Sequence, residues 1–515
     1  MALLGSILKR TIEIGGKLPK IRKSDASRQQ SKTLRQLLTK AEFTAFGEFY
    51  NFTRILSSEN LVDVFQNTVE IYDYNSIFKR WWYRTLNGEP YVCWPDHIKY
   101  FALSSGTSEA SSKQIPITKD MLRSIKKTSI LQILSQFHYN LPEAHFERGM
   151  LMIGGSTHLN YNGTYFEGDL SGITTGNLPF WFQHFYKPGS RISKERNWNS
   201  KLDEIMKNAK SWDISVICGV PAWIQILFER IIKHYQVSNI HEIWPNLAIY
   251  VHGGVHFEPY KKGFEKLLGK PIIYLETYLA SEGFIAYQNR PDSTGMKLVM
   301  DNGIFYEFVP FSDENFNGEG TMKSGAKTLH ISQVQEGPEY ALLISTCSGA
   351  WRYLIGDTIR FTSLEHYEIA ITGRTKHFLS LCGEHLSQDN MNKAIQNVSE
   401  ELNIHIKEFS VAGINYESLF AHRWYIGTDD KVDKQILKER IDENLKVLND
   451  DYRVERIAAL KDIFVDVLPT QVFYDWMRAK GKEGGQNKFP RVLKKEKLVE
   501  WETFLIEKNL IHRNE

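Results

Sequence analysis

The sequence predicts an α/β protein with a large N-terminal domain, built of parallel α/β layers plus a β-barrel-like subdomain, and a small α+β C-terminal domain. Three observations support this prediction. From about Gly149, short apolar runs that end at glycine, proline or asparagine alternate with helical segments. One stretch has the order strand–helix–strand–helix–strand, which is typical of a parallel sheet with right-handed crossovers. After Asp292 the runs shorten into hairpin-like pieces, which are typical of antiparallel pairing.

The elements follow in order along the chain. The first hundred residues predict amphipathic helices, for example over 32–50 and 61–86, because apolar residues recur every three to four positions. The parallel unit is predicted as strand 214–219, a helix that starts at Pro221, strand 247–252, helix 260–268 and strand 271–275. The hairpin pieces are 297–300, 304–309 and 340–346, and the stretch 371–376 closes this part.

The rest of the chain predicts a small mixed domain. Its expected helices are 389–402, 433–449 and 471–480, and its expected strands are 409–412, 424–426 and 464–467. The predicted domains are therefore 1–373 and 374–515.

Composition excludes several classes of protein. The chain has 515 residues, which is too long for a single small binding module, and its net charge is +2 with 24% charged and 42% hydrophobic residues. This balance excludes a disordered chain and a nucleic-acid-coating protein. No apolar stretch approaches the ~18 residues of a membrane span. The four cysteines are far apart and are expected to be buried thiols in a reducing compartment, so we expect a cytoplasmic protein without membrane or nucleic-acid partners.

The first motif that could carry chemistry is the segment 104–113. It contains six hydroxyl side chains, Gly106 and a terminal Lys113, which suits a loop whose N–H groups, hydroxyls and ammonium surround a polyphosphate. It is not a Walker loop, because the GxxxxGK[ST] pattern is absent. An ordinary serine-rich surface loop remains the alternative.

Two further motifs follow strands. The segment 276–283 comes after the third parallel strand, where Tyr278 could stack on a planar base and Glu282 could hold a divalent cation. In open parallel sheets ligands bind at the carboxyl ends of strands, which here include Gly253 and Gly254. Asp357, after a glycine, suits a ribose diol. The alternatives are a strand-to-loop turn with a satisfied Glu282 and an aspartate that only makes a turn.

The last two motifs are basic residues among glycines. They are 373–376, with 383–385 a few residues later, and 484–491. Such segments are frequently no more than solvated turns, so they gain weight only in combination with the others.

In this order the five segments resemble the adenylate-forming superfamily of acyl-CoA synthetases, luciferases and peptide-synthetase adenylation domains. Three of them, Ser-Ser-Gly-Thr-Ser…Lys113, Tyr278-Leu-Ala-Ser-Glu282 and Arg352-Tyr…Gly-Asp357, are similar to the auxin-responsive Gretchen Hagen family of acyl-acid amido synthetases. The segment Gln486-Asn-Lys-Phe-Pro-Arg491 near the end of the sequence is also similar to this family. The segment 381–386 lacks the Asp-Lys-Thr sequence of plant members of the family and resembles a bacterial branch.

The resemblance implies roles for individual residues. Lys113 and the residues Ser104, Ser105, Gly106, Thr107 and Ser108 would surround the phosphates of ATP. The turn Gly253-Gly254 and Tyr278 would flank adenine, Asp357 would hold the ribose, and Glu282 would bind Mg²⁺. Arg374 would mark the hinge, and Lys488 would be brought from the small domain to the reacting phosphate. One departure is Ala110, which stands where the family usually has a second glycine.

The resemblance thus implies an ATP-dependent ligase. It would activate a small carboxylic acid as an acyl-adenylate, release pyrophosphate and transfer the acyl group to an amine, such as an amino acid. The alternatives are an acid–thiol ligase that makes coenzyme A thioesters and a nucleotide-binding protein without turnover. The acid is expected to be apolar or aromatic and to lie against 159–163 and 172–182, where glycine turns and aromatic residues combine. Ordinary core packing of these aromatic residues remains the alternative.

Overall fold

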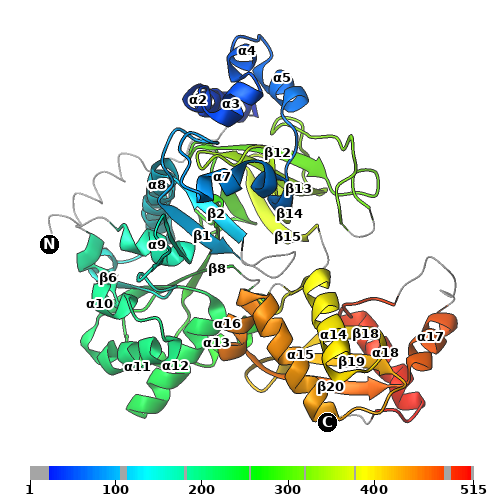
Figure 1. Ribbon diagram of the computed structural model, residues 1–515. Coiled ribbons are helices and arrows are strands. Elements are labelled where there is room, and N and C mark those ends of the chain that lie inside the picture. The colour runs from blue at the N-terminus through cyan, green and yellow to red at the C-terminus, as the bar shows by residue number, and fades with distance from the viewer. Residues whose placement is uncertain are drawn as a thin grey trace. The chain divides into compact units, whose positions relative to one another are not determined.

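The computed structural model describes residues 23–104, 113–178, 182–254, 257–317, 320–375, 378–384, 386–480 and 489–511. Its internal contacts divide the chain into two compact units (Figure 1). The first unit ends at Thr375, two residues beyond the predicted boundary, and the second holds the described residues from 378 onward. Each unit has its own hydrophobic core.

The first unit begins with helices that cover the large sheet. In α2 (Lys23–Ala41) the residues Leu34, Leu37, Leu38 and Ala41 recur at helical spacing and are buried in the core. The helix is tied to the sheet through Gln30, whose side chain donates to the carbonyl oxygens of Met300 (2.9 Å) and Ile304 (3.1 Å).

The two long helices predicted over 32–50 and 61–86 are each broken into shorter ones. The first range holds the second half of α2 and α3 (Ala45–Phe49), and the second holds α5 (Leu61–Thr68), α6 (Tyr74–Ile77), the π-helical turn η1 (Phe78–Trp82) and α7 (Tyr83–Leu86). A further short helix, α4 (Phe52–Leu56), lies between the two ranges. Local caps explain the breaks. Thr44 accepts from the Gly47 N–H to start α3, and Asp73 forms a capping box with Ser76 to start α6.

The predicted parallel unit is confirmed. It consists of β7 (Ile214–Cys218), α12 (Pro221–Tyr235), β8 (Ile249–Gly253), α13 (Glu258–Glu265) and β9 (Ile273–Ala280). The strands pair in parallel, with Val216 beside Ile249 and Ile249 beside Ile273. Two further strands, β3 (Gly149–Met152) and β6 (Tyr186–Lys187), continue the sheet beyond β7.

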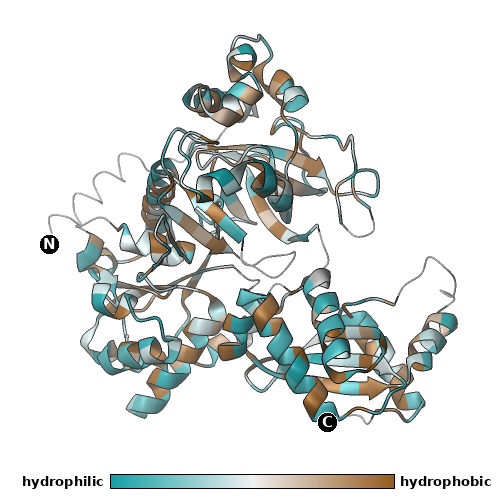
Figure 2. Ribbon diagram, viewed as in Figure 1, coloured by the Kyte–Doolittle hydropathy of each residue, from teal (hydrophilic) through white to brown (hydrophobic). Residues whose placement is uncertain are grey.

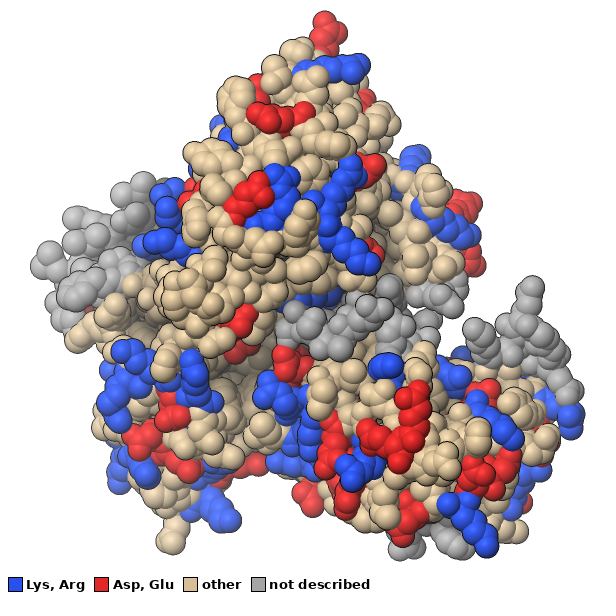
Figure 3. Space-filling view, in the orientation of Figure 1, with Lys and Arg blue, Asp and Glu red and all other residues tan. Residues whose placement is uncertain are grey.

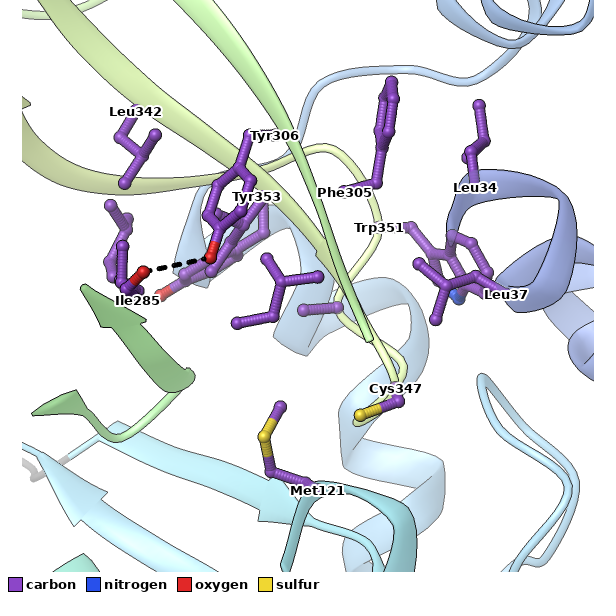
Figure 4. Packing of buried hydrophobic residues seen from close by; sticks show 14 of the residues in the cluster. Leu34, Leu37, Met121, Ile285, Phe305, Tyr306, Leu342, Cys347, Trp351 and Tyr353 are labelled. Carbon is purple, nitrogen blue, oxygen red and sulfur yellow. Dashed lines mark hydrogen bonds between the residues drawn. The ribbon is translucent and has the colours of Figure 1, made fainter. Parts of the chain in front are cut away.

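The predicted hairpin pieces are also strands, and they belong to the same sheet. They correspond to β11 (Met296–Leu298), β12 (Ile304–Pro310) and β13 (Glu339–Thr346), and the closing stretch corresponds to β15 (Glu368–Arg374). Two strands that are not among the predicted pieces, β10 (Gly283–Tyr287) and β14 (Tyr353–Ser363), belong to the same half. The eleven strands lie in the order β12-β13-β14-β15-β11-β10-β9-β8-β7-β3-β6. Figure 2 shows hydrophobic stretches within these strands, and Figure 4 shows Trp351 and Tyr353 in the core that the strands form with α2.

A second, four-stranded sheet has the order β2-β1-β5-β4. Its strands are β1 (Tyr100–Ser104), β2 (Lys113–Ile117), β4 (Asn160–Tyr161) and β5 (Phe166–Gly168). Strand β2 leads directly into α8 (Lys119–Ser135), which Thr118 caps by accepting from the Met121 N–H. The helices α9 (Leu170–Gly176), α10 (Ser190–Ser193) and α11 (Trp198–Asn208) follow.

The second unit is the predicted small α+β fold. A hairpin of β16 (Phe378–Leu379) and β17 (Leu386–Ser387) precedes a three-stranded sheet of β18 (Ile406–Tyr416), β19 (Leu419–Thr428) and β20 (Leu460–Leu468). The helices are α14 (Gln388–Leu402), α15 (Lys434–Leu448), α16 (Asp450–Ile457), α17 (Thr470–Ala479) and α18 (Lys495–Glu507). The sequence analysis did not predict α16 and α18.

The surface agrees with the near-neutral composition. On the face shown in Figure 3, positive and negative side chains are mixed over each unit. Within the described residues, no helix is long and apolar enough to cross a membrane. The cysteines form no disulfides; Cys93, Cys347 and Cys382 are buried as expected, whereas Cys218 is half-buried.

Candidate functional site

The first motif connects the two strands of a hairpin. Strand β1 ends at Ser104, strand β2 begins at Lys113, and these two residues are antiparallel partners. The connecting residues, among them Ser105, Gly106, Thr107 and Ser108, lie outside the described residues. Ser104 and Lys113 therefore mark the two points at which this segment leaves and rejoins the sheet.

Three predicted residues meet through hydrogen bonds at the carboxylate of Asp357. The hydroxyl of Tyr278 in β9 donates to Oδ2, and Nε of Arg374 in β15 donates to Oδ1 at 2.6 Å. Burial and the neighbouring carboxylate raise the pKa of Tyr278 well above its usual value, so its hydroxyl stays protonated. Burial alone would lower the pKa of Arg374, but Asp357 raises it, which keeps the guanidinium charged.

Glu282 lies beside these residues, in the turn between β9 and β10. Its side chain is buried, and burial raises the pKa of its carboxyl group, while the charge of Lys113 acts in the opposite direction. Asp357 and Arg374 also contribute to the pKa of Glu282. We call Lys113, Tyr278, Glu282, Asp357 and Arg374 the charged cluster. Residues that are up to 261 positions apart in the chain thus form one electrostatic group in the first unit.

The position of Tyr278 differs from the prediction. We expected a strand that ends at residue 275 and a tyrosine in the following loop, free to stack on a planar base. Strand β9 instead continues to Ala280, because β10 pairs with it. Tyr278 is 6% exposed within the core, and its hydroxyl bond to Asp357 is its contact with the cluster.

Gly253 and Gly254 end strand β8, at the predicted edge of the parallel sheet. A Cβ atom on Gly253 would lie 2.3 Å from the carbonyl oxygen of Thr277, so only glycine allows β8 and β9 to approach here. Gly254 has a φ of +82°, in the left-handed region that favours glycine. The turn at Gly253 and Gly254 therefore lies against Thr277, the residue that precedes Tyr278.

The sequence analysis assigned no role to the arginine of the third motif, Arg352. Its guanidinium is buried and donates to Glu307 (2.9–3.2 Å), to the Val69 carbonyl (2.7 Å) and to the Gln66 carbonyl. The ion pair joins the start of β14 to β12 and to the end of α5. The sequence did contain one sign of this ion pair: Glu307 lies inside the otherwise apolar strand 304–310, and a buried charge normally has a charged partner.

A cavity of about 330 Å³ lies in the first unit beside α8. Its walls come from α8, from α9 and the residues after it, and from β3, β7, β8, β9 and β10. Thr277, which precedes Tyr278, is one of the lining residues. Of the two segments expected to form an acid pocket, 172–182 contributes lining residues and 159–163 contributes none, because part of it forms the edge strand β4 of the other sheet.

In the second unit, Lys488 and His385 lie outside the described residues. The residues directly after Lys488 are anchored to the core of this unit. Phe489 is buried, and Arg491 donates to Glu408 (2.7 Å) and to the Phe409 carbonyl (2.9 Å). The described residues that follow Lys488 are therefore fixed to β18.

A buried carboxylate organises the hairpin that follows Arg374. Glu384 accepts from the N–H groups of Leu381 and Cys382 and from Nε2 of His422, which lies 2.8 Å away on β19. Burial would raise the pKa of Glu384, but these bonds, chiefly that from His422, lower it to about 2. The turn is thus held against the sheet of the second unit.

Three family models match this chain. They are the GH3 family N-terminal domain over residues 20–201, the GH3 family central domain over 297–374 and the GH3 family C-terminal domain over 389–497. Among curated proteins, indole-3-acetic acid-amido synthetase GH3.2 of Arabidopsis thaliana is 26% identical over 171 residues, which are 31% of this chain and 30% of that protein. Jasmonoyl–L-amino acid synthetase JAR4 of Nicotiana attenuata is 29% identical over 126 residues, 24% and 21% of the two chains. These matches span less than a third of each relative's length.

Solved structures extend the likeness in fold over the whole chain. An acyl acid amido synthetase, GH3.15, has a TM-score of 0.57 at 15% identity, with 95% of both chains covered. A 2-hydroxyisobutyryl-CoA ligase in complex with 2-HIB-AMP and CoA has a TM-score of 0.60 at 11% identity, with 95% of this chain and 94% of the ligase covered. At these identities the likeness concerns the fold alone.

Proposed function

Because the chain belongs to the GH3 family of adenylate-forming enzymes, we propose that it is an ATP-dependent acid–amine ligase whose acceptor is an amino acid. The observation that carries the proposal is the charged cluster, which joins the three motifs of the first unit beside the 104–113 hairpin. The segment 381–386 supports a place in a bacterial-type branch, and the use of ATP favours a cytoplasmic location.

The reaction would have two steps. An oxygen of the acid's carboxylate attacks the α-phosphorus of ATP, the bond from that phosphorus to the bridging oxygen breaks, and pyrophosphate leaves. The amine nitrogen then attacks the acyl carbon, the bond from that carbon to the AMP oxygen breaks, and the nitrogen loses a proton. The first step accumulates charge on phosphate oxygens, so cations held in advance would supply most of the catalysis.

The charged cluster and its neighbours suggest which residues would bind each part of ATP. Asp357, oriented by the Tyr278 hydroxyl and by Arg374, would accept hydrogen bonds from the ribose, while Gly253 and Gly254 would border the adenine. Ser104, Lys113 and the segment between them would hold the phosphates. Lys488 would reach the reacting phosphate from the second unit.

Glu282 suits a magnesium ion that also binds phosphates. The described residues contain no group of three or more His, Cys, Asp or Glu side chains that could hold a metal by themselves. Mg²⁺ is commonly bound by one or two carboxylates together with substrate phosphates and water. A buried carboxylate whose pKa is raised by burial would gain from such an ion, which would neutralise charge on the phosphates when bound.

The cavity beside α8 is the proposed acid site. Its apolar lining suits the body of a carboxylic acid, and strand β9, which contributes Thr277 to the lining, also carries Tyr278 of the charged cluster. The acid's carboxylate would then lie toward the nucleotide.

A thiol acceptor is the second candidate. The fold is shared with a coenzyme A ligase, so the fold alone does not choose between an amine and a thiol. The test is pyrophosphate exchange over a panel of acids, followed by mass spectrometry of products formed with pooled amino acids and coenzyme A. We expect acid-dependent exchange and an amide product. A thioester product would favour the second candidate, and ATP binding without exchange for any acid would indicate a protein without turnover.

A further inference from the structure

Lys201 is a buried lysine that the proposed chemistry does not use. It lies on α11 and is 3% exposed, and its ammonium group is 5.5 Å from the centre of the Trp198 ring. Burial lowers the pKa of this ammonium, while the negative charges of Asp169 and Glu195 act in the opposite direction. A buried charge costs free energy unless it is paired or hydrogen-bonded, so this lysine needs a partner in the structure.

That partner is a turn at the end of β3. The ammonium of Lys201 donates to the carbonyl oxygen of Gly154 at 3.1 Å. Gly154 lies two positions after Met152, which is both the last residue of β3 and a lining residue of the cavity beside α8. Leu202 and Ile205 on the same helix as Lys201 are fully buried, so α11 is a firm support for this bond.

The same turn packs closely against the start of α9. The N–H of Gly155 donates to the hydroxyl of Ser171 at 2.8 Å. A Cβ atom on Gly155 would lie 2.5 Å from the Cβ atom of Asp169, and a Cβ atom on Gly172 would lie 2.2 Å from the carbonyl oxygen of Ser156. Glycine at both positions leaves no side chain between the turn and the helix, so a displacement of the turn is transmitted to α9.

Helix α9 contributes directly to the lining of the cavity. Thr174 and Thr175 in the helix and Leu178 just after it are lining residues, as is Met152 before the turn. Lys201 is not among the described residues that line the cavity. It lies behind the lining instead, because it holds the turn that follows β3 and this turn in turn fixes the start of α9.

We propose that Lys201 is a positioning residue for the carboxylic acid: by holding the turn 154–156 against α9, it sets the width of the cavity and thereby the bulk of the acids that are accepted. This inference rests on the proposed function, because it assumes that the acid binds in this cavity. It holds whichever way the acid lies there, since the width of the cavity limits the acid in either direction.

The test compares two isomeric acids, the straight-chain hexanoic acid and the bulky 3,3-dimethylbutanoic acid, in pyrophosphate exchange with the full-length protein. Lys201→Met keeps a long side chain but removes the ammonium, so the turn loses its hydrogen bond and has room to move away from the cavity. A pocket with fixed walls discriminates one methylene group by about tenfold or more. We therefore expect the ratio of kcat/KM, bulky over straight, to rise by about fivefold or more, with the KM for ATP unchanged.

Three further variants make the test specific. Lys201→Arg keeps a cationic donor and should recover most of the wild-type ratio. Lys207→Met is the matched control, since this lysine lies on the same helix but is exposed and pairs with Glu204 at the surface, so the ratio should not change. Ser171→Ala removes the other bond between the turn and α9, and it should shift the ratio in the same direction even if Lys201→Met does not fold.

A merely structural lysine would give a different result. The inference is overturned if Lys201→Met and Ser171→Ala lower kcat/KM equally for both acids, or if they raise the KM for ATP as much as the KM for the acid. The ratio of the two acids is thus the decisive measurement, because a general loss of folded protein changes both values of kcat/KM by the same factor.

Binding without ATP separates this inference from the proposed function. The rise in melting temperature that each acid causes is measured in the wild-type protein and in Lys201→Met, and the variant should shift the preference toward the bulky acid. If this shift is seen but no acid supports pyrophosphate exchange, the proposed function fails and the inference stands. Exchange with an unchanged preference overturns the inference alone, and the inference also fails if neither acid binds or reacts.

Discussion

The carboxylate of Asp357 accepts one hydrogen bond from the Tyr278 hydroxyl and one from the Arg374 guanidinium. The proposed nucleotide site depends on this residue most. In Asp357→Asn we expect the KM for ATP in pyrophosphate exchange to rise by about 10- to 100-fold, because a hydrogen bond to a charged group contributes about 1.5–3 kcal/mol. Asp301→Asn is the control, since it removes a carboxylate whose ion pair with Lys127 is at the surface. An unchanged KM in Asp357→Asn would remove this residue from the nucleotide site.

Arg352 is expected to matter for stability and, through it, for the position of β14. Removing one partner of a buried ion pair leaves the other charge uncompensated and costs about 3–5 kcal/mol. Arg352→Met should therefore lower the free energy of unfolding of the first unit by about that amount in urea titrations. The double variant Arg352→Met/Glu307→Leu should recover much of the loss, since no unpaired charge remains. A double variant as unstable as the two single losses added together would contradict this explanation.

Several site residues were identifiable from the sequence because their type and spacing are unusual. A hydroxyl-rich loop that ends in lysine, a glutamate after a strand and a Gly-Asp pair each stand out locally. Arg352 does not, because a charged residue among apolar ones acquires a role only from what surrounds it. The hydrogen bond between the Tyr278 hydroxyl and Asp357 joins residues 79 positions apart. It could not be predicted either, because local sequence patterns do not show such distant contacts.

At the scale of elements, the hairpin β16–β17 is held to the sheet of the second unit by the buried carboxylate of Glu384. Its pKa is lowered to about 2, below the ordinary value of 4.5. A carboxyl group with a lower pKa in the folded state stabilises the fold above its unfolded pKa, and this contribution is lost as the pH falls toward the folded pKa. The second unit should thus lose stability between about pH 4.5 and 2.

The measurement is the difference in urea midpoint of the second unit between the wild-type protein and Glu384→Gln at pH 6 and at pH 3. The difference should shrink at pH 3, because the wild-type protein has by then lost part of the stabilisation. Burial raises the pKa of the neighbouring Glu455 well above its usual value, so its effect on stability has the opposite sign. Glu455→Gln is therefore the control, and a difference for Glu384→Gln that is independent of pH would contradict the assignment.

The sequence predicted most elements of both units but not all of their ends. The parallel strands were found because apolar runs between glycine and proline are local features. The end of β9 was placed too early, since β10 returns along it and extends the pairing, and such pairing is not visible in one strand alone. The helices of the first hundred residues were drawn too long because their caps at Thr44 and Asp73 were overlooked.

At the scale of the whole molecule, the proposed chemistry needs both units. The charged cluster belongs to the first, whereas Lys488 belongs to the second, three positions before Arg491, which contacts β18. Lys488→Ala should lower the rate of pyrophosphate exchange by about 10²–10³, the effect of removing one charged donor from a transition state, and should leave ATP binding largely intact. Lys497→Ala, on an exposed face of α18, should have no effect. Exchange at the wild-type rate in Lys488→Ala would exclude this lysine from the site.

The sequence by itself determined the fold class, the order of the two units and the family, and it supplied the residue types of the proposed site. These depend on local periodicity and on short motifs, which are present in any conformation of the chain. Only the tertiary structure decided that Tyr278, Glu282, Asp357, Arg374 and Lys113 form one group and that Arg352 is a buried ion-pair partner. Those facts depend on burial and on strand pairing between distant residues, because both the charge of a side chain and its need for a partner are set by its neighbours in space.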